Sequence, residues 1–564
     1  MGDLASRQAG TRVNAEQASR RVMREPTRLR FGEGRRSWTR RATYIQESRR
    51  GSGVGMSVRG NRQQHGKPRR RPVCRTTEVR EGRIGPVGVA ERPVVVEKPG
   101  NAGGAKGPQD EINAGRSETR RLAMSLRPPE KVRKLQAALH AKAKGSPSYR
   151  FYALYDKVYR EDILAYAHRC CAAQRGAPGV DGQSFQDIEA YGVERWLGEL
   201  AEELRKKEYR PEAVRRVDIP KPNGKTRPLG IPTIRDRVVQ TATMVVLEPI
   251  FEADLEPEQY AYRKGRSGLD AVRRVHSLLN TGHTEVVDAD LSGYFDTIPH
   301  AELMKSVARR ISDRWMLRLI KMWLQTPVEE QGDRGHRQRT TRAKDEGRGI
   351  PQGAPISPLL SNLYMRRFLL AWKVLGHERH LDAHIVNYAD DFVICCRGTA
   401  EEAMLAMRTL MERLKLTVNE SKTRLCRVPE ESVDFLGYTI GQCWSPKTGR
   451  TYIGTRPSKT RIQRLCREIS EMTSRRFLVT EADDRVERLN RLLRGWSNYF
   501  CLGPVSKAYR SVDRHARYRL RRWLRLKHKV PGHGIARFPD QYLHQTLGLI
   551  QLEARTRNFP WATA

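Results

Sequence analysis

Two acid-bearing β-strand patterns constrain this chain more than any other feature of its sequence. The motif Tyr388-Ala389-Asp390-Asp391 separates two short apolar runs, 384–387 and 392–395, which predicts a β-hairpin with two carboxylates at its tip. A second β-rich run, 285–289, ends at Asp290. Adjacent like charges repel, so an apolar hairpin gains no stability from them, whereas a bound cation would resolve the repulsion. The two patterns therefore predict a shared metal site.

Carboxylates on two neighbouring strands suit phosphoryl or nucleotidyl transfer. That chemistry uses two divalent ions roughly 3.5–4 Å apart, one to activate the attacking oxygen and one to stabilise the leaving group. Mg²⁺ prefers oxygen ligands, typically one or two carboxylates together with substrate phosphates. We therefore expect two Mg²⁺ ions as cofactors.

The charge balance indicates a polyanionic partner. Lys and Arg number 105 against 64 Asp and Glu, which gives a formal net charge of +41. Phosphate neutralisation supplies affinity whatever the base sequence, so nucleic acid is the first candidate and a membrane surface the weaker one. The sequence has no apolar run of 18 residues, no secretory signal and no zinc-ligand spacing among its nine cysteines. We expect a cytoplasmic protein (bacterial cytoplasm or nucleoid) with free thiols and no membrane partner.

Composition and periodicity divide the chain into parts. Residues 1–125 are rich in Arg, Gly, Gln and Ser and predict a disordered basic extension, which is too long for a transit peptide to be preferred. Residues 126–212 carry apolar residues at helical spacing, and 213–440 alternates helices with short β-rich runs, an α+β pattern. Residues 456–564 predict very basic helices.

Three successive motifs resemble those of group II intron-encoded reverse transcriptases. They are the run from Asp290 to Phe295, residues 349–358 (Gly-Ile-Pro-Gln-Gly-Ala-Pro-Ile-Ser-Pro), and 388–391. The resemblance covers roughly 126–555. It implies a right-hand polymerase fold of the α+β class, with a helical extension of the fingers (126–212), fingers and palm with an antiparallel sheet (213–440), and an α-helical thumb and maturase RNA-binding domain (456–564).

The resemblance also implies a function. It describes an RNA-directed DNA polymerase that copies intron RNA into DNA and assists group II intron splicing and mobility. The implied partners are group II intron RNA, an RNA template with its DNA primer, target DNA and dNTPs, and no protein partner is indicated. The zinc-binding His/Asn/His nuclease that follows in some relatives has no counterpart before Ala564, so we do not expect this chain to cut the second DNA strand.

Site residues follow from the matching motifs. Asp290, Asp390 and Asp391 are the expected catalytic residues. Asp290 and Asp390 would bridge the metals, Asp391 would support them, and the Leu291 carbonyl would be a further ligand. Asp288 and Asp296 do not stand at the matching position. The expected nucleotide-binding residues are Lys221 and Arg227 on a fingers hairpin, Phe295 as a floor beneath the deoxyribose, Gln352 in the Gly/Pro-rich turn, and Lys422 near the phosphates.

Two further segments relate to the same family. Residues 260–267 read Tyr-Ala-Tyr-Arg-Lys-Gly-Arg-Ser, whereas the family usually has Tyr-Gly-Phe-Arg-Pro-Gly-Arg-Ser, so both arginines persist while the first Gly and the Pro are replaced. Residues 435–438, Phe-Leu-Gly-Tyr, resemble the primer grip.

A basic helix is predicted within the C-terminal part. Its apolar residues fall on one side and its cations on another, so one face packs and the other offers charge to a phosphate backbone. The apolar side comprises Ala516, Leu520, Trp523 and Leu524, and the expected RNA-binding side comprises Arg514, Arg517, Arg521, Arg525 and Lys529.

Two other functions stay open at this point. One is a non-catalytic RNA-binding splicing factor with a decayed polymerase core, and the intact acids, Lys221 and Arg227 argue against decay. The other is a free-standing retron-type or defence-type reverse transcriptase, which the maturase-like segment disfavours.

Overall fold

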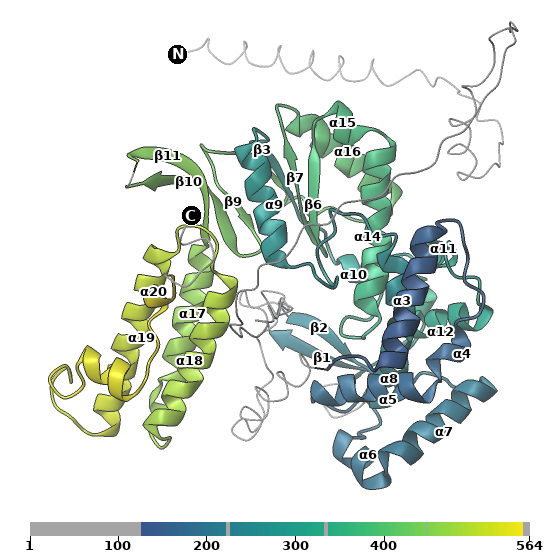
Figure 1. Ribbon diagram of the computed structural model, residues 1–564, viewed down its shortest axis with the longest axis horizontal. Coiled ribbons are helices and arrows are strands. Elements are labelled where there is room, and N and C mark those ends of the chain that lie inside the picture. The colour runs from purple at the N-terminus through teal and green to yellow at the C-terminus, as the bar shows by residue number, and fades with distance from the viewer. Residues whose placement is uncertain (1–125, 221–225, 332–336, 447, 557–564) are drawn as a thin grey trace, which may run out of the picture. The chain divides into compact units, whose positions relative to one another are not determined.

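The structure is a computed structural model that describes residues 126–220, 226–331, 337–446 and 448–556 (Figure 1). The predicted disordered extension, 1–125, and the fingers turn with Lys221 lie outside the described residues. The described part combines helices with three small sheets, and its C-terminal part is helical (Figure 1). The predicted α+β class with a helical C-terminal domain is confirmed.

Several helices precede the first sheet, and α8 follows its first two strands. Their apolar residues recur at helical spacing, so that α3 buries Val132, Leu139 and Ala143 and packs, like α5, against the largely buried α8. The helices are α3 (Glu130–Gly145), α4 (Tyr155–Val158), α5 (Glu161–Ala173), α6 (Phe185–Tyr191), α7 (Val193–Lys206) and α8 (Ile234–Glu252). The sheet has the order β2-β1-β4-β5, with β1 (Val214–Pro220), β2 (Thr226–Ile231), β4 (Val328–Gln331) and β5 (Arg337–Thr340).

The second sheet, in the order β6-β7-β3-β8, positions the predicted acids. Its strands are β3 (Glu285–Ala289), β6 (His384–Tyr388), β7 (Asp391–Cys396) and β8 (Arg424–Arg427), and all three pairings are antiparallel. The surrounding helices are α9 (Gly268–Asn280), α10 (Tyr294–Thr297), α11 (His300–Ala308), α12 (Arg314–Leu324), α13 (Arg342–Asp345), α14 (Ser357–Val374), α15 (His377–His380) and α16 (Ala400–Arg413).

The two faces of this sheet belong to different cores. Val287 and Ile394 join the core that contains α14 and α16, whereas Val286 and Val393 join the core that contains α9. Because side chains alternate along a strand, the residues that share a face with Val286 and Val393 include Asp290 and Asp391. Alternation therefore points both acids to the α9 side.

A third sheet separates the acid-bearing sheet from the C-terminal helices in sequence. It comprises β9 (Val433–Phe435), β10 (Tyr438–Ser445) and β11 (Arg450–Pro457), in the order β11-β10-β9. The sequence reading assigned no strands to 441–455. The reason is physical, because this ribbon exposes much of its length and therefore lacks a clean apolar alternation.

The C-terminal part has its own core. The predicted apolar side of the basic helix is buried as expected, and it packs against residues of the two preceding helices. The elements are α17 (Lys459–Met472), η1 (Arg475–Phe477), α18 (Ala482–Tyr499), α19 (Ser506–Lys527), η2 (Tyr542–Thr546) and α20 (Leu552–Arg555). Among the described residues, none of the helices combines the length and apolarity needed to cross a bilayer.

Candidate active site

Asp290 and Asp391 stand at the same end of two adjacent strands. Ala289, the last residue of β3, pairs with Phe392 of β7, so Asp290 follows one member of the pair and Asp391 precedes the other. Both acids also fall on the same face of the sheet by alternation. The fold thus brings together acids that are about a hundred residues apart in sequence.

The hairpin tip that carries Asp390 is tight. Tyr388 pairs with Asp391, which leaves Ala389 and Asp390 as the two turn residues. Ala389 has a φ of 61°, in the left-handed region, which costs a non-glycine residue roughly 1–2 kcal/mol. The Asn387 side-chain amide donates to the Ala389 carbonyl at 2.9 Å and holds the turn. Such local strain is typical of functional positions.

The charges of the tip act on groups from several elements. Burial raises the pKa of Tyr294 well above its usual value, and the charge of Asp390 adds to that effect. Burial lowers the pKa of Arg461, at the start of α17, and the charge of Asp391 opposes that effect. The acidic tip therefore lies within electrostatic reach of α10 on one side and α17 on the other.

Asp290 is held by a loop that follows α16. Its Oδ2 accepts from the Asn419 side-chain amide at 2.8 Å and lies 3.0 Å from Nζ of Lys422. The backbone N–H of Asp290 donates to Oγ1 of Thr423 at 3.3 Å. Within the described part of the chain, Asp290, Asp390 and Asp391 do not form a group with ligand atoms all within 4.8 Å of one another.

The backbone after Asp290 leaves the Leu291 carbonyl available. Leu291 forms an antiparallel bridge with Val418, in which the Asp290 carbonyl accepts from Asn419 N–H at 2.8 Å and Ser292 N–H donates to the Thr417 carbonyl at 2.9 Å. In this pattern the bridged residue directs its own carbonyl away from its partner, here towards the side of β7. That direction suits the predicted role of Leu291 as a ligand.

The predicted nucleotide-binding residues Arg227 and Gln352 are in contact. Nε of Arg227 donates to Oε1 of Gln352 at 2.9 Å, and Nε2 of Gln352 donates to Oδ2 of Asp296 at 3.4 Å. The Gln352 turn can approach β2 this closely because residue 353 is a glycine. A Cβ there, where φ is 108°, would lie 2.5 Å from the Gly230 carbonyl oxygen. The fold therefore joins the Gln352 turn to the fingers sheet.

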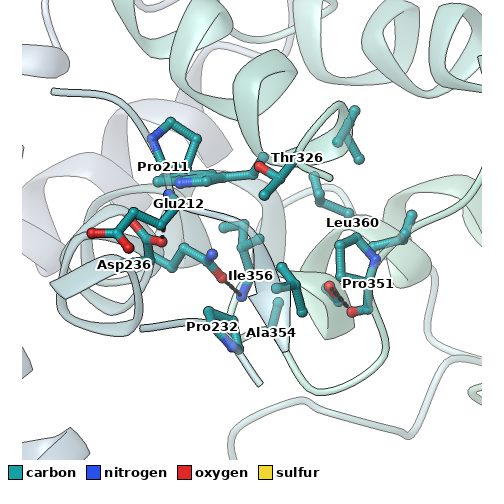
Figure 2. A pocket seen from close by; sticks show the side chains of 15 residues that line it. Pro211, Glu212, Pro232, Asp236, Thr326, Pro351, Ala354, Ile356 and Leu360 are labelled. Atoms are coloured by element: carbon teal, nitrogen blue, oxygen red, sulfur yellow. Dashed lines mark hydrogen bonds between the residues drawn. The ribbon is translucent and has the colours of Figure 1, made fainter. Parts of the chain in front are cut away.

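A pocket beneath the Gln352 turn shows how this turn is supported. Oε1 of Gln240 accepts from the Ile356 N–H at 3.4 Å, and the hydroxyl of Ser357 donates to the Pro351 carbonyl at 2.7 Å. Figure 2 shows the side chains that line the pocket, among them Pro351 and Ile356. Asp236 lines the same pocket and accepts from the hydroxyl of Tyr209 at 2.6 Å. Burial raises the pKa of Asp236 to about 6.

Phe295 lies next to the same turn. Its side chain is buried, its ring packs edge-on against Tyr294 at 5.7 Å between centroids, and its carbonyl accepts from the Ile350 N–H at 2.8 Å. The residues predicted for nucleotide binding within the described ranges are thus placed in two groups, one around Gln352 and one around Asp290.

The segment that resembles a primer grip contacts two C-terminal helices. Leu436 and Gly437 form the turn between β9 and β10 with φ values of 51° and 86°. The Leu436 carbonyl accepts from the hydroxyl of Tyr499 at 2.9 Å, and the Gly437 carbonyl accepts from the N–H of Ser458 at 3.0 Å. These bonds attach α17 and α18 to the sheet region beside the acids.

The predicted RNA-binding residues divide into two groups in the structure. Arg517 and Arg521 both pair with Asp540, and Nη1 of Arg525 donates to the Gly532 carbonyl at 2.5 Å. Arg514 is exposed, and so is Lys529, which lies beyond the helix with a φ of 53°. The helix ends at Lys527, shortly before Pro531, so Lys529 does not continue the helical face as the spacing had suggested.

Other exposed residues of α19 were not selected from the sequence. Tyr518, with 57% of its surface exposed, and Arg522 follow Arg514 at steps of four, so these three residues form one exposed stripe. The spacing of these three residues is visible in the sequence, but spacing alone does not tell whether Tyr518 is exposed or packs in the core.

The donor set at the acids fits a divalent cation of the magnesium class. Three carboxylates and a backbone carbonyl are hard oxygen ligands, and the residues that carry them lie at neighbouring strand ends. Lys422, whose side chain is 64% exposed, now neutralises Asp290 and is free to move outward if a cation takes its place.

Comparisons with known proteins identify the family of the chain. Residues 219–440 match the family described as reverse transcriptase (RNA-dependent DNA polymerase), and residues 462–538 match the group II intron, maturase-specific domain. Protein YkfC of Escherichia coli (strain K12) is 35% identical over 351 residues, which cover 55% of this chain and 88% of YkfC.

Two other relatives are more distant. The group II intron-encoded protein LtrA of Lactococcus lactis subsp. cremoris is 26% identical over 352 residues, 51% of this chain and 57% of LtrA. Nuclear intron maturase 2, mitochondrial, of Arabidopsis thaliana is 30% identical over 111 residues, 20% of this chain and 15% of that protein. With the acids, the fingers contact and the helical C-terminal part in place, the chain belongs to the group II intron-encoded reverse transcriptase/maturase family, a family of RNA-directed DNA polymerases.

Proposed function

We propose that this protein copies group II intron RNA into DNA by two-metal nucleotidyl transfer, and that its C-terminal helices bind the intron RNA to assist splicing and mobility. The observation that carries the proposal is the placement of Asp290 and Asp391 at one end and on one face of paired strands, with Asp390 in the tight turn beside them.

The acids would hold the metals and the loops would hold the nucleotide. When bound, two Mg²⁺ ions activate the primer 3′ oxygen and stabilise the leaving pyrophosphate. Asp290 and Asp390 would bridge them, with Asp391 in support and the Leu291 carbonyl as a further ligand. The tight turn at Ala389 would hold the backbone that carries the two tip carboxylates in place before substrate arrives.

A chain of contacts would position the incoming dNTP. Arg227 is held by Gln352, which is itself held by Asp296, so the guanidinium is oriented rather than mobile. Such charge-assisted donors suit a triphosphate. Lys221, which lies outside the described residues, would bind the same triphosphate. Lys422 would reach the phosphates once it leaves Asp290, and Phe295 would exclude a ribose 2′-hydroxyl.

The exposed stripe on α19 offers the RNA a cationic and aromatic surface. Arg514 and Arg522 flank Tyr518 at single-turn spacing, which combines phosphate contacts with a ring available for stacking. Arg517, Arg521 and Arg525 would act on the RNA indirectly, because they hold the segment that contains Gly532 and Asp540.

The experiment that tests the proposal combines two assays on one preparation. Purified protein is given a primed RNA template with dNTPs and Mg²⁺, and separately a group II intron precursor RNA at low Mg²⁺. We expect cDNA synthesis in the first assay and faster splicing in the second. Splicing assistance without any cDNA would instead identify a non-catalytic splicing factor, and cDNA synthesis without faster splicing would identify a free-standing reverse transcriptase.

A further inference from the structure

A cluster of two histidines and an aspartate lies at the end of the acid-bearing sheet opposite Asp290. His283 is in the turn between α9 and β3, Asp382 precedes β6, and His384 is the first residue of β6. One nitrogen of each ring and one oxygen of Asp382 lie within 4.8 Å of one another. Because the polymerase acids follow the other ends of β3 and β6, this cluster is separate from the site described above.

Two of the three ligand-atom separations match a tetrahedral metal site. Nε2 of His283 lies 3.2 Å from Oδ1 of Asp382, and Nε2 of His384 lies 3.5 Å from the same oxygen. A tetrahedral ion with bonds of about 2.0–2.1 Å separates its ligand atoms by roughly 3.3 Å. The third separation is within 4.8 Å, so small side-chain rotations would complete the site.

In each histidine ring, the hydrogen-bond partners of Nδ1 determine whether Nε2, which faces Asp382, carries a proton. Nδ1 of His384 faces Oε1 of Glu378 at 3.1 Å. Nδ1 of His283 faces the Leu278 carbonyl at 3.3 Å and Oγ1 of Thr281 at 3.2 Å, and that hydroxyl donates its own proton to Leu278. A neutral ring therefore needs its single proton on Nδ1.

With the single proton of each ring on Nδ1, none of the three atoms that face one another has a proton to donate. Both Nε2 atoms would then turn lone pairs towards Oδ1 of Asp382, and three acceptors would face one another. Protons on both Nε2 atoms would also remove the conflict, but they would place two imidazolium rings with centroids 4.9 Å apart. A single divalent cation accepts all three lone pairs at once, and the carboxylate–histidine contact of Glu378 is the support that metal-binding histidines usually have.

The remaining features of the cluster also suit a bound ion. Asp382 has a φ of 41°, in the left-handed region, and its second oxygen, Oδ2, lies 3.6 Å from Nε of Arg397, which leaves Oδ1 for the cluster. The His283 side chain is only 8% exposed, whereas that of Asp382 is 48% exposed, so one side remains open for a water ligand.

We propose that His283, Asp382 and His384 bind one Zn²⁺ ion, or a cation of similar ligand preference, with water as the fourth ligand. Two imidazoles and a carboxylate suit zinc better than magnesium. The ion would tie the α9–β3 turn to the α15–β6 turn across the end of β7, which lies between β6 and β3 in the sheet. Its role would be to stabilise the base of the sheet that carries the polymerase acids at its other end.

The test uses the full chain, expressed without a histidine tag, stripped of metal and titrated with Zn²⁺ against a chromophoric chelator. We expect one tight equivalent, which His384→Gln and Asp382→Asn each weaken at least about 100-fold, and which Glu378→Gln weakens about 10-fold. The matched control, His380→Gln, changes an exposed histidine four residues away and should bind as the wild type does.

Two further readouts separate zinc binding from a structural effect of the substitutions. Co²⁺ should give visible d–d absorption of a four- or five-coordinate ion in the wild type and in His380→Gln but not in His384→Gln. Zinc should raise the melting temperature of the wild type and leave that of Asp382→Asn unchanged. Equal zinc affinity in wild type and His384→Gln, or wild-type binding only at millimolar zinc, would overturn the proposal, as would altered stability in the variants with no dependence on zinc.

Discussion

Nζ of Lys422 lies 3.0 Å from Oδ2 of Asp290, so an ammonium group stands where the proposed site requires a metal ion. The side chains are 64% and 33% exposed, and ion pairs at such positions contribute only about 0–1 kcal/mol. A divalent cation can therefore displace the ammonium at small cost. Lys422 would then be released towards the triphosphate, which couples nucleotide binding to the arrival of the metal.

Lys422→Ala should separate these two effects. Removing the competing charge should lower the Mg²⁺ concentration for half-maximal activity by up to about fivefold. Loss of a charge-assisted donor should raise KM for dNTP by about tenfold or more. Steady-state primer extension at varied Mg²⁺ and dNTP measures both, and a variant that needs more Mg²⁺ than the wild type would contradict the displacement of Lys422.

Phe295 should control sugar selection. Phe295→Val keeps an apolar side chain but removes the ring, so the preference for dNTP over rNTP, measured as a ratio of kcat/KM values, should fall by roughly 10–100-fold. Phe295→Tyr retains the ring and should retain the preference. If the valine variant selects dNTPs as well as the wild type does, Phe295 serves only the packing against Tyr294.

Asp236 should make the stability of the fingers depend on pH. Burial raises its pKa from 3.8 to about 6, so the folded state binds the proton more tightly than the unfolded state does. The resulting stabilisation is present below about pH 4 and is lost as the pH rises through 6, because deprotonation then occurs in a buried site. Asp236→Asn lacks this titration.

The difference in unfolding free energy between wild type and Asp236→Asn should therefore shift against the wild type by about 1–2 kcal/mol from pH 4.5 to pH 6.5. Urea unfolding at the two pH values measures it. Asp181→Asn, which changes an exposed acid, is the control and should show no such shift. A pH-independent difference for Asp236→Asn would mean that the carboxyl group keeps its unfolded pKa.

The arginines of α19 should differ in their roles. A variant with Arg514→Ala, Tyr518→Ala and Arg522→Ala should bind intron RNA more weakly, and the slope of log affinity against log salt should become shallower by about 2. Its melting temperature should stay unchanged because the three side chains are exposed.

The paired variant Arg517→Ala with Arg521→Ala should lower the melting temperature by a few degrees, since it removes both partners of Asp540. Equilibrium RNA binding at several salt concentrations, combined with thermal melts, distinguishes the two sets. If the Arg517/Arg521 variant has the melting temperature of the wild type but binds RNA more weakly, these two arginines contact the RNA directly, as the helical spacing predicts.

The elements predictable from the sequence were those with a strong local pattern. The strands β3, β6 and β7 each contain a short β-favouring apolar run, and the acids at their ends are visible without any structure. The partners of those acids were not predictable to the same degree. Asn419 holds Asp290 across 129 positions of sequence, and no periodicity encodes that contact.

The face of α19 illustrates the other limit. Helical spacing correctly identified the buried side with Leu520 and Trp523. It could not distinguish an arginine that is exposed to solvent from one that pairs with Asp540, because the position of Asp540 against α19 is decided by tertiary structure. The strands β10 and β11 were also not predicted. They pair with each other along a largely exposed ribbon, so their sequences lack a clear apolar alternation.

The most direct measurement is single-turnover primer extension on an RNA template with Asp290→Asn, Asp390→Asn and Asp288→Asn. Asp288 is the matched control, because it shares the strand and face of Asp290 but pairs with Arg424. We predict that the first two variants lose at least about 1000-fold in rate while binding intron RNA as the wild type does, and that Asp288→Asn stays within about tenfold of the wild type. Equal losses for Asp288→Asn and Asp290→Asn, or full activity of Asp390→Asn, would contradict the assignment of Asp290 and Asp390 as metal ligands.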